Sequence, residues 1–463
     1  MTDPSRQPVG STAPASPRQP VGIAAPASSR QPVVVAARRT ALATAGRGLA
    51  DVPVEHLAAS VLLALAGDLD VRTDRVADVI LGNCMGPGGN VARVAALAAG
   101  FGPSVPGVTI DRQCGSGLDA ITLAAGLVQA GRGDLYLAGG VESASTAPIR
   151  SWRPAGEDKA ARTYDRARFA PPPYADLDMG MAADLVARDA GVGRVRQDAY
   201  AARSHARAVA AAEAKRFAAE LVPVAGLDYD ERPREGLDER RLARLRPAFV
   251  PEADGGTVTA GNSCGVNDGA AAVAVVPECL RAEHGWPGLS LVDWECTGSD
   301  PERPGLGLVH AVRRVLGRQD VDLDEVGAIE FVEAFAGQVL ACADALDLDP
   351  VRICPDGGAL ALGHAWGATG AVVMVRLFTR MVRERGPHLG LAAVSVGGGM
   401  GVAALVRRVG PAVETGPAVE TGPAVETGSA VEAGSAVEAG SAVEAGRAAQ
   451  AGPIGSHQVG SHG

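Results

Sequence analysis

Residues 108–118 read VTIDRQCGSGL. The first three side chains predict a buried strand, and the glycines around Ser116 predict a tight turn. The segment from about Leu118 to Ala130 is rich in alanine and leucine, which predicts a helix. We expect the unpaired amide groups and the dipole of this helix to lower the pKa of a thiol at its N-terminus. Cys114 is therefore the leading candidate for a catalytic nucleophile.

Two segments further along the chain add polar groups in glycine-rich surroundings. Residues 357–370 read GGALALGHAWGATG and supply the imidazole of His364. Residues 393–401 read AVSVGGGMG and supply the hydroxyl of Ser395. A histidine taken alone is most often structural, but the glycines around His364 favour a functional role.

The rest of the chain alternates strand-like and helical segments. Strands are predicted at 76–81, 108–110, 135–138, 271–276, 328–332 and 391–396, and helices at 54–65, 91–99, 118–130 and 308–316. This alternation predicts an α/β fold in which helices cover the faces of a sheet. The rhythm breaks between about Ser143 and Pro247, where arginine, aspartate and proline accumulate, so this part is predicted to be an insertion.

The two ends of the chain are repetitive. Residues 1–32 repeat an Arg-Gln-Pro-Val unit, which is typical of a disordered leader. Residues 409–463 repeat a six-residue unit that carries one valine and one glutamate. A hexapeptide β-helix is the alternative, but about six units would form only about two coils, too few to bury a core. The prediction is therefore a low-complexity acidic tail.

Composition excludes several classes of function. The net charge of -10 gives no indication of the basic surface that binding to nucleic acid requires. No apolar run reaches the roughly 18 residues of a membrane span, so no membrane partner is expected. The seven cysteines contain no CxxC pair, which disfavours a metal site and indicates a reduced protein with a cytoplasmic location. Apart from Cys114 and Cys264, the cysteines are expected to be core fillers.

Read in order, the motifs of the core resemble those of the thiolase family. They are ARRT at 37–40, GLADVP at 48–53, GN at 82–83, NVAR at 90–93, the Cys114 segment, GGVES at 139–143, MGMAAD at 179–184, VTAGNSCGVNDG at 258–269, VEAFA at 332–336, and the His364 and Ser395 segments. Each motif alone is weak evidence, whereas their joint order is specific. The resemblance implies a duplicated five-layer α-β-α-β-α sandwich. It also implies an N-terminal half at 33–280, with a loop domain inserted at about 143–247, and a C-terminal half at 281–408.

The resemblance also implies a mechanism. Cys114 matches a nucleophilic cysteine that takes an acyl group from coenzyme A, and His364 matches a histidine that helps to ionise it. Such help is needed because a free thiol, with a pKa of about 8.5, is only slightly ionised at neutral pH. Gly397 matches an oxyanion-hole glycine. The coenzyme A thioester would be a substrate, with no permanently bound cofactor and no metal.

Two positions depart from the family in the second half of the reaction. Ser395 stands where a second cysteine removes a proton from carbon, and a neutral hydroxyl has no useful basicity near pH 7. Val332 stands where an asparagine holds a water for the enolate, and its side chain forms no hydrogen bond. The resemblance places both beside the substrate, together with Phe335 and with Cys264, which replaces a serine.

We therefore predict an acyltransferase that loads an acyl group on Cys114 from acyl-CoA or an acyl carrier protein. The acceptor would be an amine, an alcohol, a carrier-protein thiol or an activated carbon nucleophile. One alternative is a working acetyl-CoA acetyltransferase or 3-ketoacyl-CoA thiolase with another base such as Cys264, although simple packing is the favoured role for that thiol. The other is a noncatalytic subunit that scaffolds a partner. Family members are dimers or tetramers, so a homodimer or homotetramer is expected.

Overall fold

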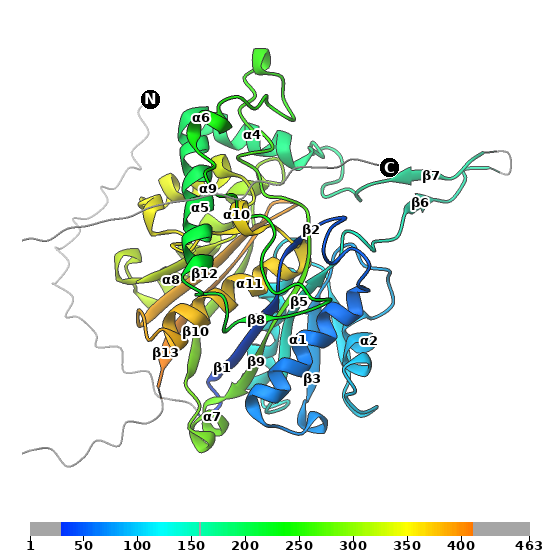
Figure 1. Ribbon diagram of the computed structural model, residues 1–463, viewed down its shortest axis with the longest axis vertical. Coiled ribbons are helices and arrows are strands. Elements are labelled where there is room, and N and C mark those ends of the chain that lie inside the picture. Colours follow the sequence, from blue (N-terminus) through cyan, green and yellow to red (C-terminus); the bar gives the residue numbers. More distant parts are fainter. Residues whose placement is uncertain (1–28, 157–158, 411–463) are drawn as a thin grey trace, which may run out of the picture. The chain divides into compact units, whose positions relative to one another are not determined.

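The computed structural model describes residues 29–156 and 159–410 (Figure 1). The predicted leader and acidic tail lie almost entirely outside these ranges. The described residues are built around a sheet of 11 strands. Its spatial order is β11 (Ala328–Phe331), β12 (Leu389–Val396), β13 (Met400–Val409), β10 (Gly288–Gly298), β1 (Pro32–Thr40), β9 (Asn267–Pro277), β5 (Tyr136–Glu142), β3 (Asp78–Gly82) and β4 (Gly107–Ile110), with β2 (Ala43–Thr44) paired to β9 and β8 (Leu221–Val222) paired to β1.

The strand pairings repeat, which shows the expected duplication. In the N-terminal half, β3 and β5 are parallel, and β9 and β1 follow in antiparallel pairing. In the C-terminal half, β11 and β12 are parallel, and β13 and β10 follow in antiparallel pairing. The halves join where Val33 and Val34 of β1 pair with Ser290 and Leu289 of β10.

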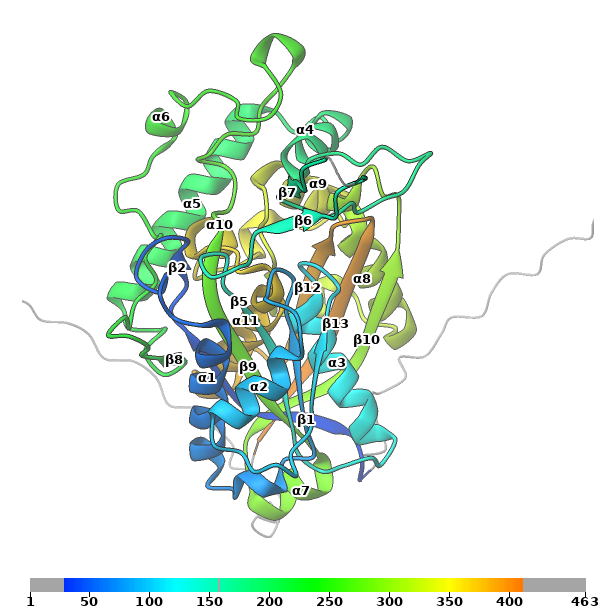
Figure 2. The same cartoon turned by 90° about the vertical axis from the view of Figure 1, so that its right-hand side faces the viewer.

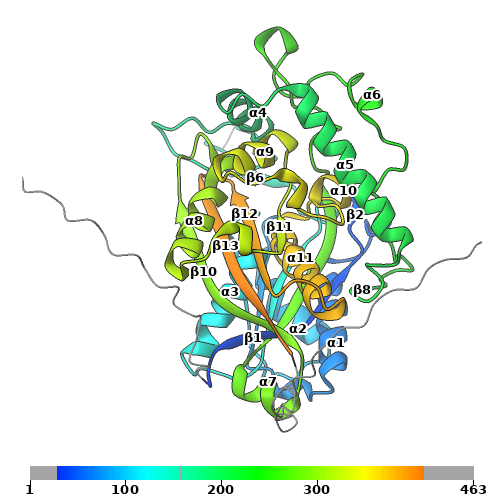
Figure 3. The ribbon, with the colours of Figure 1, turned by 90° about the vertical axis from the view of Figure 1, so that its left-hand side faces the viewer.

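Helices form three layers around the two halves of the sheet. Helices α1 (Val54–Leu69) and α2 (Val91–Ala98) pack on the N-terminal half (Figure 2), and α8 (Gly307–Gln319) and α9 (Ala336–Ala345) belong to the opposite outer layer (Figure 3). Between the halves lie α3 (Ser116–Gln129) and α11 (Trp366–Phe378), which contact strands of both. Three buried apolar clusters fill the spaces between these layers. The five-layer sandwich is therefore confirmed.

Glycines let the two central helices touch. A Cβ added at Gly117 of α3 would lie 2.8 Å from the carbonyl oxygen of Gly367, and one added at Gly370 of α11 would lie 2.6 Å from the amide nitrogen of Leu118. Both distances are too short for a side chain. Because Cys114 precedes α3 and His364 precedes α11, this close crossing brings the two catalytic candidates together.

The segment between β5 and β9 carries most of the remaining elements. It contains the hairpin of β6 (Arg150–Trp152) and β7 (Arg162–Tyr164), then α4 (Met179–Asp189), α5 (Arg194–Glu213) and α6 (Glu239–Leu242). Elsewhere lie α7 (Glu278–His284), α10 (Ala359–Leu362), 3₁₀ turns at Thr73–Arg75, Glu252–Asp254, Pro304–Leu306, Leu323–Glu325 and Pro350–Arg352, and a π-helical turn at Thr379–Arg383. Helices α4 and α5 pack against α9, and α5 also packs against α10, so this segment covers the residues around His364.

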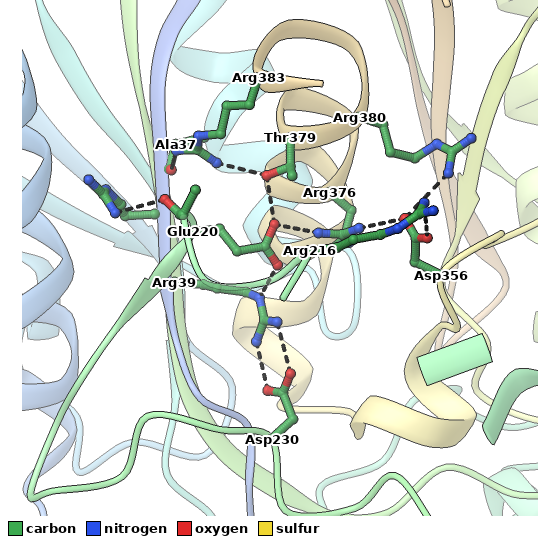
Figure 4. A network of polar contacts seen from close by, with 12 residues as sticks. Ala37, Arg39, Arg216, Glu220, Asp230, Asp356, Arg376, Thr379, Arg380 and Arg383 are labelled. Atoms are coloured by element: carbon green, nitrogen blue, oxygen red, sulfur yellow. Dashed lines mark hydrogen bonds and ion pairs between the residues drawn. The ribbon is translucent and has the colours of Figure 1, made fainter. Parts of the chain in front are cut away.

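A buried ion network fastens the segment to the central layer (Figure 4). Glu220 accepts hydrogen bonds from Arg39 Nε at 2.7 Å and from Arg376 Nη1 at 2.5 Å. Arg39 also pairs with Asp230, and Arg376 pairs with Asp356. Since these side chains come from β1, from the inserted segment, from α11 and from the turn before α10, the network fixes α11 and the loop that carries His364.

Candidate active site

One apolar cavity of about 110 Å³ collects the predicted site residues except Val332. Its walls are Cys114, Cys264, Phe335, His364, Ser395 and Gly397, together with Met179, Ala182, Ala183, Pro304, Gly305, Ala334, Gln338, Trp366 and Val396. Val332 is buried in the core and is not part of this wall. These residues come from both halves of the sheet and from the inserted segment, so only the folded chain forms the cavity.

Cys114 lies in the turn between β4 and α3, and two features shape this turn. Gln113 has a left-handed φ of 46°, which turns the backbone sharply before the cysteine. The Ser116 hydroxyl accepts a hydrogen bond from the amide of Arg112 and donates to the carbonyl of Gln113. A Cβ on Gly115 would lie 2.8 Å from Val396, so glycine is required where the turn meets β12.

The expected lowering of the Cys114 pKa is wrong. Burial raises the pKa of the thiol to about 12, because the apolar cavity disfavours the charged sulfur. The backbone N–H groups of Cys114 and Gly397 act in the opposite direction, but they are outweighed. The thiol is therefore protonated at neutral pH, and its activation needs a base within the cavity.

The imidazole of His364 lines the same cavity and is uncharged. Burial lowers its pKa to about 4, so the imidazole is neutral at pH 7. The Thr369 hydroxyl donates to the carbonyl of Ala365 at 2.9 Å and lies 2.9 Å from His364 Nδ1, so Nδ1 carries the proton and donates to Thr369. Nε2 then carries the lone pair, and it has no hydrogen-bond partner among the described residues. Thr369 was not predicted, although it follows His364 within the same glycine-rich segment.

The backbone of His364 is tied to the loop that carries Cys264. The His364 amide donates to the carbonyl of Gly265 and to Oδ1 of Asn267, with N···O distances of 3.1 and 3.2 Å. Gly363 has a φ of 114°, and a Cβ there would lie 2.3 Å from the Asn267 side chain. The imidazole and the Cys264 loop therefore form one rigid wall of the cavity.

Gly397 begins the glycine turn between β12 and β13 that faces Cys114. Its N–H reaches the Cys114 sulfur and favours the thiolate. Gly398 and Gly399 adopt left-handed φ angles of 85° and 77°, which explains the run of glycines. The ring of Phe169 lies against Gly397, because a Cβ on this glycine would be 3.0 Å from the ring. The N–H of Gly397 is therefore suitably placed to stabilise the oxyanion of an acyl group bonded to the Cys114 sulfur.

Ser395 lies in the cavity wall, but its hydroxyl is already engaged. It donates to the carbonyl of Gly305 at 2.7 Å and accepts from the Leu308 amide at 3.2 Å and from Gln338 Nε2 at 3.4 Å. Cys342 lies beneath it and donates to the same carbonyl. Neither Gln338 nor Cys342 was predicted to belong to this site. A hydroxyl with both roles occupied has no means to remove a proton from carbon.

The neighbouring Glu333 is structural. Its carboxylate accepts hydrogen bonds from the Tyr200 hydroxyl at 2.8 Å, the Ser204 hydroxyl at 2.7 Å and the Leu360 amide at 3.3 Å. These bonds anchor the loop at 332–336 to α5 and α10. Val332 itself offers only an aliphatic side chain that packs in the central core. Val332 therefore contributes no polar group to the cavity.

Other classes of site find little support in the part of the chain that the structure describes. Within residues 29–156 and 159–410, no group of three or more His, Cys, Asp or Glu side chains is arranged to hold a metal ion. No helix in these same ranges combines the length and apolar character of a membrane span. Of the five cysteines expected to fill the core, Cys342 and Cys354 are buried, but Cys279 is exposed, so the expectation was wrong for Cys279.

Comparisons with known proteins agree with this geometry. The thiolase N-terminal domain matches residues 32–279, and the thiolase C-terminal domain matches residues 287–408. The putative acetyl-CoA C-acetyltransferase YhfS of Bacillus subtilis (strain 168) is 40% identical over 375 residues, which cover 80% of this chain and 97% of that protein. The putative acetyl-CoA C-acetyltransferase VraB of Staphylococcus aureus (strain MRSA252) is 38% identical over 379 residues, covering 80% and 98%. A crystal structure of the Bacillus anthracis acetyl-CoA acetyltransferase matches with a TM-score of 0.78 at 35% identity, covering 82% of this chain and 99% of that one.

Proposed function

The chain belongs to the thiolase family and is an acyltransferase of that superfamily, and on this premise we propose that it carries its acyl group as a thioester on Cys114. The donor is an acyl-CoA or an acyl carrier protein. One observation supports this most directly: Cys114, the free Nε2 of His364 and the N–H of Gly397 meet at one cavity.

The acylation step follows from these groups. His364 Nε2 accepts the thiol proton, and the Cys114 sulfur attacks the carbonyl carbon of the donor thioester. The N–H groups of Gly397 and Cys114 stabilise the oxyanion. When the carbon–sulfur bond to the donor breaks, the imidazolium returns its proton to the leaving thiolate. His364 thus begins and ends the step neutral.

The acceptor is proposed to differ from the enolate of a second acyl-CoA. The engaged hydroxyl of Ser395 provides no base, and Val332 provides no hydrogen bond for an enolate. An amine, an alcohol, a carrier-protein thiol or an activated carbon nucleophile avoids this requirement. A decarboxylating condensation avoids it as well, because loss of carbon dioxide creates the enolate directly.

Mass spectrometry of the intact protein tests the acyl-enzyme. Incubation with a panel of acyl-CoAs should add one acyl group, located on the Cys114 peptide. Cys114→Ala should abolish this adduct, and Cys279→Ala, which removes an exposed thiol away from the cavity wall, should retain it. Absence of an adduct with every donor would refute the proposal.

A second candidate is carbon–carbon bond chemistry, as the names of the relatives suggest. The observation in its favour is that the Cys264 thiol lines the same cavity as Cys114 and His364. Thiolysis of acetoacetyl-CoA that is lost in Cys264→Ser but survives in Ser395→Ala would support Cys264 as the base. The reverse pattern would return that role to Ser395.

A noncatalytic scaffold is the remaining alternative. The unpartnered Nε2 of His364 beside a thiol argues against it, because a scaffold has no physical need for a buried free base. Absence of an acyl adduct on Cys114 with every acyl-CoA, in a chain that is folded, would restore it.

We also propose a cytoplasmic location and a homodimer or homotetramer. All seven cysteines are free thiols, as expected in a reducing compartment. The strand β4 is an edge of the sheet, and Val108 on it is 40% exposed, with Leu97 and Leu123 exposed on the adjacent helices. An open apolar edge of this kind pairs readily with a second copy. Size-exclusion chromatography of Val108→Asp should show dissociation if β4 forms the contact.

A further inference from the structure

The glycine turn that carries the proposed oxyanion hole has little rigidity of its own. Residues 397–399 are three consecutive glycines, and glycine restricts its own backbone less than any other residue. An oxyanion hole is effective only when its N–H groups are already aimed before charge develops on the oxygen. The turn therefore needs support from neighbouring parts of the chain.

Phe169 packs against the first two glycines of this turn. A Cβ added at Gly397 would lie 3.0 Å from Cε2 and 3.1 Å from Cδ2 of the Phe169 ring. A Cβ added at Gly398 would lie 3.0 Å from the Phe169 carbonyl oxygen. Gly398 needs glycine for its left-handed φ, whereas Gly397 needs it because the ring takes up the space of a side chain. The ring therefore limits how far the Gly397 amide can rotate.

Gly399, at the other end of the turn, is held by the loop that follows β10. Its carbonyl accepts a hydrogen bond from the Ser299 amide at 2.7 Å, and a Cβ added at Gly399 would lie 2.6 Å from the Pro301 nitrogen. The carboxylate of Glu302, in the same loop, accepts a hydrogen bond from the Ala175 amide at 3.0 Å. Two loops, which are joined to each other, therefore hold the turn at both ends.

An ion pair fixes the loop that carries Phe169, which lies between β7 and α4 (Figure 1). The half-buried Arg166 guanidinium pairs with the Asp176 carboxylate at 2.9 Å, and it also donates to the carbonyls of Asp176 and Leu177. Its Cζ lies 4.8 Å from the centroid of the Phe169 ring, within the range of a cation–π contact. The Asp176 carboxylate accepts from the Phe169 amide at 3.0 Å. Both the backbone and the ring of Phe169 are therefore held.

Phe169 influences the cavity through the glycine turn. Gly397 is part of the cavity wall and Phe169 is not. The turn in its place meets the nucleophile segment, because a Cβ added at Gly115 would lie 2.8 Å from the side chain of Val396, directly before Gly397. The chain of contacts thus runs from the inserted segment to the turn and from the turn to Cys114.

We propose that Phe169 is a positioning residue, which aims the N–H of Gly397 at the oxyanion that forms during acylation of Cys114. Arg166 and Asp176 hold its ring in place for this purpose. The inference rests on the proposed acyl-enzyme. It assigns the rigidity of the oxyanion hole to the inserted segment, since the glycines themselves supply none.

Acylation rates of the full-length protein test this role. The acyl-CoA that acylates wild type fastest is used over a concentration series, and intact mass follows the adduct, which separates the rate at saturation from the half-saturating concentration. In Phe169→Ala the rate at saturation should fall about 10- to 100-fold, while the half-saturating concentration stays within about twofold of wild type. Phe169→Leu, which keeps part of the apolar bulk, should recover much of the rate. Tyr174→Ala removes a ring that is 51% exposed on the same loop, and this matched control should behave as wild type.

A second variant releases the ring without removing it. Asp176→Ala should lower the rate at saturation in the same way, by less than Phe169→Ala, and it serves as the test if Phe169→Ala does not fold. Wild-type rates in these variants would overturn the proposal. A change confined to the half-saturating concentration would also overturn it, because the ring would then belong to the binding surface of the donor. Failure of the proposed function is distinct, since wild type itself would then form no adduct and the positioning role would fall with it.

Discussion

At the scale of single residues, the neutral imidazole of His364 matters more than the dipole of the helix that follows Cys114. Both groups are desolvated by the same apolar walls, which raise the pKa of the thiol to about 12 and lower that of the imidazole to about 4. Desolvation therefore keeps both groups uncharged until a substrate arrives. Proton transfer from thiol to imidazole then needs the correct tautomer, which a neighbouring hydroxyl provides.

Thr369→Val should slow acylation of Cys114 by about 10- to 100-fold with little change in fold. The variant removes the acceptor for the Nδ1 proton, so the imidazole no longer presents its lone pair at Nε2. Stopped reactions analysed by intact mass give the rate. Thr369→Ser keeps the hydroxyl and should retain most of the rate. Equal rates for both variants would show that Thr369 does not set the tautomer.

Stability should fall with acidification between pH 6.5 and about 4. The pKa of His364 is about 4 in the folded protein, against 6.5 for the free group, so the unfolded chain binds more protons in this window. The full contribution, up to about 3 kcal/mol, is present above the unfolded pKa and is lost as the pH falls to the folded pKa.

Urea unfolding at about pH 7 and about pH 4.5 measures this dependence. His364→Gln should lose less free energy of unfolding between the two conditions than wild type. Burial also lowers the pKa of His205 to about 4. Because His205 is unchanged in that variant, its part of the pH dependence of stability remains. The exposed His56→Gln should behave as wild type. An identical loss in His364→Gln and wild type would contradict the neutral, buried state of His364.

At the scale of elements, the crossing of α3 and α11 determines whether Cys114 and His364 meet. Gly370→Ala should lower the free energy of unfolding by about 1–3 kcal/mol, because its methyl group would press on the backbone of Leu118. Gly126→Ala, on the open side of α3 with no atom near its new methyl, should be neutral or stabilising by up to about 1 kcal/mol. Chemical denaturation of the two variants provides the comparison, and similar values would contradict the close crossing.

Prediction of elements from the sequence succeeded where burial produces a simple pattern. The strands near β3, β4, β5, β9, β11 and β12 and helices α1, α2, α3 and α8 were predicted in the right places, but β5 and α1 extend further toward the C-terminus, and β9 further toward the N-terminus, than predicted. The strands β1, β10 and β13 were not predicted. Strand β10 joins the two halves of the sheet, and its residues are partly buried, partly half-buried and in places charged. It therefore lacks the regular alternation of apolar and polar residues by which a strand is predicted.

At the scale of the whole molecule, the ion network around Glu220 connects segments far apart in sequence. Glu220→Gln should lower the free energy of unfolding by about 3–5 kcal/mol, because it leaves Arg39 and Arg376 incompletely paired in the interior. Asp324→Asn removes a carboxylate whose side chain is 91% exposed and should cost less than about 1 kcal/mol. Equilibrium unfolding in urea distinguishes them. A Glu220→Gln loss no larger than that of the control would show that the network contributes little.

The chemistry of the site was largely readable from the sequence, and its working geometry was not. Ordered motifs identified the family and predicted Cys114 as the nucleophile and His364 as the base, because acyl transfer restricts which residue types can stand there. Only the folded chain showed that the Ser395 hydroxyl is engaged by Gly305, that Thr369 orients the imidazole, and that Phe169 packs against Gly397. Residue types carry intrinsic reactivity, whereas desolvation, tautomer and pairing depend on neighbours that are often remote in sequence and that only tertiary packing brings into contact.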